Sequence, residues 1–394
     1  MKIAQSTNKT IDPANDIESY RKKRRRKYRI RRIITVCIAL ALIGGIALFA
    51  IRFDVSDISE LLSQNTTVQN GSSGYPQKLF GRTLQFETSG SLLALASDSH
   101  LYLFNSAGDT VLSDQHSYAR PTMAAANKRV LLYDRGGNSF RVDNSSGVVY
   151  EREMSNEIIC AALNADGAAA VAAHEERYSG SVSVFNLQNQ QVFKWYSADY
   201  QITGLTLEGS CLAVACLGAR DGAILSTVYQ MDTGGGSEQQ VVSVEFSDMM
   251  VLSVRYLNNG SLCVIGDTKT VLLSASGEVM AEYSYGKTVN DFCDDTGDVT
   301  VLSLASSTNA AEQEIVVLDQ SAALLGSATV NREIKWLAAG NGSVFLLCSN
   351  EILQYDQHMN LLKSIEVRTD SSQVCVVGSD LYVLGLGEIS KLSY

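Results

Sequence analysis

The sequence predicts an all-β fold, an eight-bladed β-propeller, preceded by one transmembrane α-helix. Three observations predict this. Short Val, Leu, Ala and Tyr runs alternate with Asn, Asp, Gly and Ser clusters, a unit of four such runs recurs, and one uncharged segment lies near the N-terminus. We expect four regions: a basic tail over residues 1–32, a membrane helix over 33–51, a flexible linker over 52–74 and the propeller over 75–394.

The segment from Ile33 to Ile51 has 19 residues without a charge. At about 1.5 Å per residue it spans about 28 Å, close to the thickness of the hydrocarbon core of a bilayer. Ten basic residues precede it between Arg21 and Arg32, which places the N-terminus in the cytoplasm and the propeller outside the membrane. A cleaved signal peptide and a buried helix of a soluble protein are the alternatives, although a signal peptide usually has only about 7–15 apolar residues.

Charge divides the chain into two parts. Residues 1–32 hold 12 Lys and Arg against three acids, whereas the remainder holds 20 against 39. The basic run serves as a topology signal and could also contact anionic lipid, and nucleic-acid binding by the acidic body is not expected. The candidate lipid-contacting residues are Arg21, Lys22, Lys23, Arg24, Arg25, Arg26 and Lys27.

Internal repetition gives the blade count. Seven units of four strand-like runs extend from TLQFE at Thr83 to LLKSIEV at Val367, and an eighth unit supplies only three runs before Tyr394. The spare run YPQKLFG, from Tyr75 to Gly81, would complete the eighth blade and close the ring, which removes open sheet edges. The 320 residues from 75 to 394 give 40 per blade, the usual length of a four-stranded blade. A seven-bladed ring is the alternative.

Cysteine placement favours buried, unpaired thiols. Outside the membrane segment there are seven Cys, an odd number, and most lie inside apolar runs such as SLCVIG and VFLLCS. A disulfide framework suits a much smaller domain.

Two segments resemble a known family. The two segments are SYARP, from Ser117 to Pro121, and RVLLYDRGGNSFRV, from Arg129 to Val142. The family that they resemble consists of membrane-anchored propellers of unknown function from Gram-positive, mostly clostridial, bacteria. The resemblance covers nearly the whole chain, with a departure at Arg120, where related sequences tend to have Asn. It implies architecture and location but no activity.

Motifs for known chemistry are not found in the sequence. The four His lack zinc-ligand spacing, there is no nucleophile elbow, phosphate-binding loop or dinucleotide fingerprint, and only Trp195 and Trp336 are present, too few for a quinone-dependent propeller. The acidic run over residues 294–298 reads as a turn rather than a calcium loop. We therefore expect no catalytic residues, no metal and no cofactor, although a pair of catalytic carboxylates stays open.

Distinctive polar residues collect in loops on one side of the predicted ring. In a propeller, the turns between the second and third strands of each blade lie on the same face as the links between blades. Arg and Tyr in such loops are typical of contact surfaces. The alternative is that Asp134-Arg135-Gly136-Gly137 forms a hairpin turn. The candidate partner-binding face comprises Tyr118, Arg120, Asp134, Arg135, Gly136, Gly137, Glu175, Arg177, Tyr178, Asp199, Tyr200, Arg220 and Asp221. If residues 75–81 close the ring, the linker arrives on the opposite face.

These observations favour a binding or scaffolding propeller of the cell envelope, integral to the cell membrane by a single pass, with an envelope protein or glycan as partner. An enzyme acting on envelope glycans or peptides and a transmembrane sensor are the alternatives. The sequence does not fix the oligomeric state.

Overall fold

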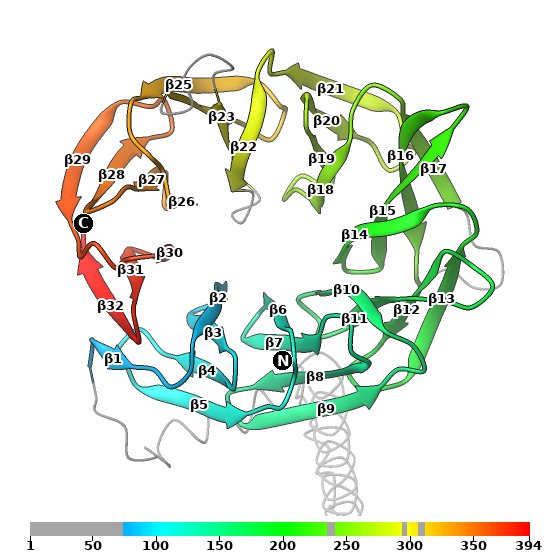
Figure 1. Ribbon diagram of the computed structural model, residues 1–394, viewed down its shortest axis with the longest axis horizontal. Helices are drawn as coiled ribbons and strands as arrows, with labels where there is room; N and C mark the ends of the chain where they lie inside the picture. The colour runs from blue at the N-terminus through cyan, green and yellow to red at the C-terminus, as the bar shows by residue number, and fades with distance from the viewer. Residues whose placement is uncertain (1–73, 235–240, 294–297, 306–311) are drawn as a thin grey trace, which may run out of the picture. The chain divides into compact units, whose positions relative to one another are not determined.

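A computed structural model of the chain describes residues 74–234, 241–293, 298–305 and 312–394. These residues form eight antiparallel sheets of four strands each, arranged in a ring (Figure 1). The first strand of each blade, A, lies nearest the axis and the fourth, D, lies outermost. The eight-bladed prediction is confirmed, and the seven-bladed alternative is wrong.

Blades 1 to 4 follow one another along the chain, each with its strands in the order A to D. Blade 1 comprises β2 (Thr83–Ser89), β3 (Leu92–Ser97), β4 (His100–Phe104) and β5 (Thr110–Gln115), and blade 2 comprises β6 (Pro121–Ala126), β7 (Arg129–Asp134), β8 (Ser139–Asn144) and β9 (Gly147–Glu153). Blade 3 comprises β10 (Ile158–Leu163), β11 (Ala169–Ala173), β12 (Gly180–Phe185) and β13 (Gln191–Ser197). Blade 4 comprises β14 (Gln201–Glu208), β15 (Cys211–Arg220), β16 (Ala223–Asp232) and β17 (Val241–Phe246).

Blades 5 to 8 continue the same pattern. Blade 5 comprises β18 (Val251–Tyr256), β19 (Leu262–Gly266), β20 (Lys269–Leu273) and β21 (Val279–Ser284), and blade 6 comprises β22 (Thr288–Cys293), β23 (Thr300–Ala305), β24 (Gln313–Leu318) and β25 (Leu324–Val330). Blade 7 comprises β26 (Trp336–Gly340), β27 (Ser343–Leu347), β28 (Glu351–Asp356) and β29 (Leu361–Glu366). Blade 8 comprises β30 (Gln373–Val377), β31 (Asp380–Gly385), β32 (Glu388–Ser393) and, from the start of the propeller, β1 (Gln77–Lys78).

Strand β1 closes the ring, as the sequence predicts, but it is short. Gln77 pairs with Ile389 and Lys78 pairs with Glu388, so β1 covers only the first part of the outer edge of β32. The Gln77 side chain donates to the carbonyl of Gly108, in the turn between the C and D strands of blade 1 (2.7 Å). Two blades therefore hold the closing strand, one through the sheet and one through a side chain.

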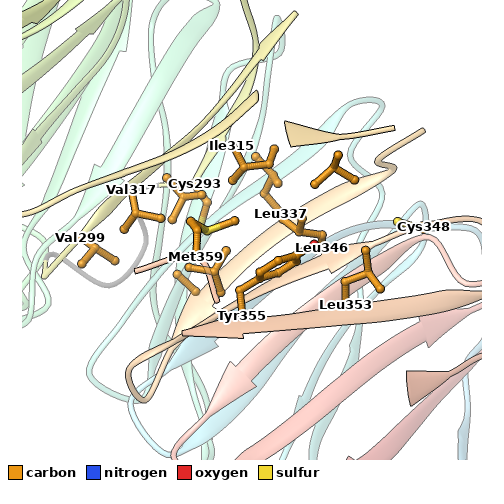
Figure 2. Close-up of a cluster of buried hydrophobic side chains, with 14 residues drawn as sticks. Cys293, Val299, Ile315, Val317, Leu337, Leu346, Cys348, Leu353, Tyr355 and Met359 are labelled. Carbon is orange, nitrogen blue, oxygen red and sulfur yellow. The ribbon is translucent and has the colours of Figure 1, made fainter. Parts of the chain in front are cut away.

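The core lies between neighbouring blades. Strands B and C are buried on both faces, and their aliphatic side chains pack against the next blade. Figure 2 shows the cluster between blades 6 and 7, where Ile315 and Val317 of β24 face Leu337 and Leu346.

Five of the seven predicted free thiols are buried, whereas Cys160 is half-buried and Cys211 is exposed.

Two faces of the ring differ in what they carry. The B–C turns and the links between blades form one face, here the B–C face, and the A–B and C–D turns form the other, the C–D face. Gly74 lies on the C–D face, because its carbonyl accepts from Gln77 (2.6 Å) and its backbone contacts Gly108. Gly74, the first described residue, therefore lies on the face at which we expect the linker, while the rest of the linker lies outside the described residues.

The predicted tail, membrane helix and linker, including the candidate lipid-contacting residues, lie outside the described residues, apart from Gly74. Within the described ranges, no helix is long and apolar enough to cross a membrane.

Candidate functional site

The loop after β7 binds the link that precedes blade 2. Asp134 Oδ1 accepts the backbone N–H of Arg120 (2.8 Å), and the carbonyl of Arg120 accepts the N–H of Arg135 (3.0 Å). The two arginines are exposed residues, whereas Asp134 is half-buried. Asp134 therefore positions the backbone, and the guanidinium groups are the parts available to a partner.

The same loop also joins blade 3. The N–H of Gly136 donates to the carbonyl of Ile158 (2.8 Å), and the N–H of Ile158 donates to the carbonyl of Gly137 (2.6 Å). Gly136 has φ +79°, which disfavours other residues, and a Cβ at Gly137 would overlap the Asp134 carboxylate. The two glycines are thus required by a junction between blades, beyond the tight turn that the sequence suggests.

Tyr118 lies below the surface. It is half-buried against the cluster between blades 1 and 2 and stacks at an angle on His116, with ring centroids 5.5 Å apart. Burial raises the pKa of Tyr118 to about 12. It is a packing residue more than a contact residue.

Blade 3 presents an ion pair at its outer edge. Lys194 Nζ lies 2.9 Å from Glu175 Oε1, which also accepts the Ser181 hydroxyl (2.8 Å). The hydrogen bond from Lys194 lowers the pKa of Glu175, so this carboxylate stays ionised near neutral pH. The pair fixes the loop after β11 against the outer strand β13.

Two tyrosines stack beside this ion pair. The rings of Tyr178 and Tyr196 have centroids 4.7 Å apart, and Lys194 Nζ lies 4.8 Å from the centroid of Tyr196. Tyr178 is 46% exposed and Tyr196 42%. Arg177 beside them is also exposed. An exposed aromatic pair held by a cation–π contact is an ordered surface on which a ligand can stack.

Blade 4 carries a second polar cluster. Both oxygens of Glu245 accept from Arg220 (2.6 and 2.7 Å), and Arg220 also donates to the Tyr200 hydroxyl (2.8 Å). Arg220 lowers the pKa of Glu245, which makes this carboxylate a poor general acid. The forked pair holds the end of the long hairpin β15–β16 against β17.

A shallow pocket of about 350 Å³ lies beside this pair, lined by Arg220, Asp221, Ala223, Ile224, Leu225, Glu245 and Ser247. Asp221 has φ +53° and Gly222 has φ +82°, as in a two-residue type I′ hairpin, so Asp221 serves the turn. Asp199, in the preceding link, is exposed.

The predicted residues thus form three separate groups on blades 2, 3 and 4, not one centre. The sequence did not point to Lys194, Tyr196 and Glu245, because they lie on the outer D strands and not in the loops where binding residues are expected. Lys194 and Tyr196 are two residues apart on a strand, so their side chains lie on the same side of it, and this spacing could be read from the sequence. Their closeness to Tyr178, however, follows only from the pairing of β12 with β13. Across the described ranges, no group of three or more His, Cys, Asp or Glu could hold a metal ion.

Comparisons with known proteins give a family and a fold. A profile described as a family of unknown function (DUF5711) matches residues 68–392. No curated protein matches the sequence significantly.

Solved propellers share the architecture. BamB from Moraxella catarrhalis is 10% identical, with 82% of this chain and 100% of that chain covered and a TM-score of 0.53. AztD from Citrobacter koseri is 10% identical, with 74% and 86% covered and a TM-score of 0.53. Sqt1 from Saccharomyces cerevisiae is 11% identical, with 82% and 98% covered and a TM-score of 0.55. At these identities the likeness shows the fold alone.

Proposed function

The chain belongs to the family of unknown function DUF5711, and from its own residues we propose that it is a membrane-anchored binding or scaffolding propeller of the cell envelope. Its partner is an envelope protein or glycan, bound on the B–C face over blades 2 to 4. The observation that carries this proposal is the exposed pair Tyr178–Tyr196, in which Tyr196 also contacts Lys194 on the same strand, β13. Large exposed rings that are already ordered lose little entropy when a partner covers them.

The proposed location rests on the sequence. The uncharged segment 33–51 and its basic flank support a cytoplasmic N-terminus and an extracytoplasmic propeller, and the resembling Gram-positive proteins have the same plan. The position of Gly74 on the C–D face supports the proposal that the B–C face is presented away from the membrane. A contact surface on that face stays accessible to other envelope components.

Photo-crosslinking in cells tests the binding role. A photoreactive amino acid replaces Arg177 on the B–C face of the full-length protein, and a second variant carries it at Met280, which is 62% exposed at the start of β21 near the C–D turn. We expect a discrete crosslinked product at position 177 that is absent at position 280 and disappears when Tyr178→Ala is added. Equal products at both positions, or none at 177, would argue against the proposal.

Protease treatment of wall-stripped cells tests the location. We expect residues 75–394 to be removed from intact cells and a short fragment with the N-terminal tail to remain. A propeller that is degraded only after the cells are lysed would contradict the orientation.

A further inference from the structure

The Lys194, Tyr196 and Tyr178 side chains form a column, here the tyrosine column, that ends in an open aromatic face. Lys194 pairs with Ser183 and Tyr196 pairs with Ser181, so the two side chains lie on one side of β13, with Tyr196 nearer the B–C face. Tyr178 comes from the loop just beyond and stacks on Tyr196. The order toward the B–C face is therefore Lys194, Tyr196, Tyr178.

Tyr178 differs from most tyrosines of the protein. Within the described ranges, Tyr178 and Tyr196 are the most exposed tyrosines, and the ring of Tyr196 contacts both Lys194 and Tyr178. Tyr178 ends the column at 46% exposure. Because the ring contacts Tyr196 and nearly half of the residue stays exposed, Tyr178 has free surface on which a flat group could extend the stack.

Charged residues lie next to Tyr178 in the chain. Glu175 is held in place by Lys194 and Ser181, and exposed Glu176 and Arg177 directly precede Tyr178. These side chains offer both hydrogen-bond donors and acceptors around the edge of a stacking surface. Covering these charged groups with an apolar protein surface would cost free energy, whereas a hydroxyl-rich ligand can form hydrogen bonds with them.

We propose that the tyrosine column binds a pyranose ring of an envelope glycan, an inference that rests on the proposed binding function. One face of a pyranose carries C–H groups, whose partial positive charge matches the negative face of the Tyr178 ring, while its hydroxyl groups reach donors and acceptors at the edge. The acidic propeller disfavours polyanions such as nucleic acids, because phosphates would be repelled. A sugar unit that carries no charge, or a single carboxylate, pays a much smaller electrostatic cost than a polyanion.

Titration of the full-length protein in detergent with two sugars tests this proposal, one the peptidoglycan disaccharide N-acetylglucosaminyl-N-acetylmuramic acid and the other chitotetraose. We expect saturable binding of at least one by calorimetry, about tenfold weaker in Tyr178→Ala and within about twofold in Tyr178→Phe, which keeps the ring. Phe80→Ala, which removes a 71% exposed ring after β1, is the matched control and should bind normally.

No binding of either sugar, or unchanged binding by Tyr178→Ala, would overturn the glycan assignment. Loss of binding accompanied by a large fall in melting temperature would also overturn it, because the ring would then be structural. The proposed function is judged separately. A crosslinked protein at position 177 together with no sugar binding would leave the binding role standing and identify a protein partner instead.

Discussion

At the scale of single residues, an internal ion cluster joins blades 1 and 2. Arg141 Nη1 lies 3.0 Å from Asp114 Oδ2, and Arg141 Nε lies 3.0 Å from Asp143 Oδ2, although the latter pair is not aligned as a hydrogen bond. The Asp143 side chain is fully buried. Burial raises the pKa of Asp143 to about 6, against the opposing effect of Arg141 and with a further increase from Asp114. No substrate could reach this carboxyl group, so its titration concerns stability.

The raised pKa predicts the sign of a pH effect on Asp143→Asn. The folded state binds the Asp143 proton more tightly than the unfolded state does. The stabilisation that comes from this protonated carboxyl group is therefore present below about pH 4 and is lost as the pH rises through about 6. At about 1.4 kcal/mol per pKa unit, the variant should gain up to about 3 kcal/mol relative to the wild type between pH 4 and pH 7. Chemical denaturation at several pH values measures the difference. A constant difference, or a relative loss, would contradict the burial argument.

Gly137 gives a second prediction at this scale. In Gly137→Ala the added Cβ would overlap the Asp134 carboxylate, whose hydrogen bond holds Arg120. We expect a loss of about 1–3 kcal/mol in the free energy of unfolding, typical of overpacking. Gly204→Ala is the control, since no atom lies within 4 Å of the added Cβ and φ is not in the left-handed region. Similar stability of the two variants would mean that the loop adjusts freely.

At the scale of elements, strand identities follow from sequence, whereas details of pairing do not. The run SLLALAS, from Ser91 to Ser97, forms β3 over Leu92–Ser97, because alternating turns and apolar runs mark strands directly. The closing run from Tyr75 to Gly81 forms only β1, because Pro76 has no N–H to donate and Gly81 turns the chain with φ +81°.

Bulges are a further detail that sequence does not reveal. In six blades the register of the C and D strands shifts by one residue near the C–D turn, as between Val184 and Phe185. A bulge depends on which residues lie opposite each other, and a single strand does not contain that information. The same limit explains the candidate site, where Tyr178 was predicted as a loop residue while its neighbour Tyr196 became apparent only from strand pairing.

Packing between blades gives the prediction at this scale. Leu346 of β27 is fully buried in the cluster between blades 6 and 7 (Figure 2). Leu346→Ala should destabilise the protein by about 2–5 kcal/mol, through lost burial and the cavity that remains. Leu362→Ala, at a side chain 56% exposed on β29, should stay within about 0.5 kcal/mol of the wild type. Thermal unfolding compares the two, and equal effects would mean that the interface does not carry the stability.

At the scale of the whole molecule, the ring closes through β32, which pairs with β31 on one side and β1 on the other. Deleting residues 388–394 removes this strand, exposes two sheet edges and separates blade 8 from the start of the propeller. We expect the truncated protein to aggregate or to lose cooperative unfolding, as seen by size-exclusion chromatography and calorimetry. A soluble truncation with a single sharp transition would show that the ring is stable without closure.

The arrangement of the faces links structure to the proposed role. The chain joins the propeller on the C–D face, and the exposed Tyr178, Arg135 and Arg220 lie on the B–C face. The sequence anticipated this opposition because strand alternation fixes which turns share a face. It could not show that Asp134 holds the link before blade 2, or that Gly136 and Gly137 join blades 2 and 3. The tyrosine column and the exposed arginines are thus the groups available for binding.

The central claim is that the B–C face, and not the C–D face, binds the partner. Its most direct test compares the full-length double variants Arg135→Ala/Tyr178→Ala and Met280→Ala/Leu361→Ala for recovery of the product crosslinked from a photoreactive residue at position 177. We predict that recovery falls at least about tenfold in the first variant and is unchanged in the second, with melting temperatures of both close to that of the wild type. Equal recovery from both variants, or a loss confined to the second, would contradict the account.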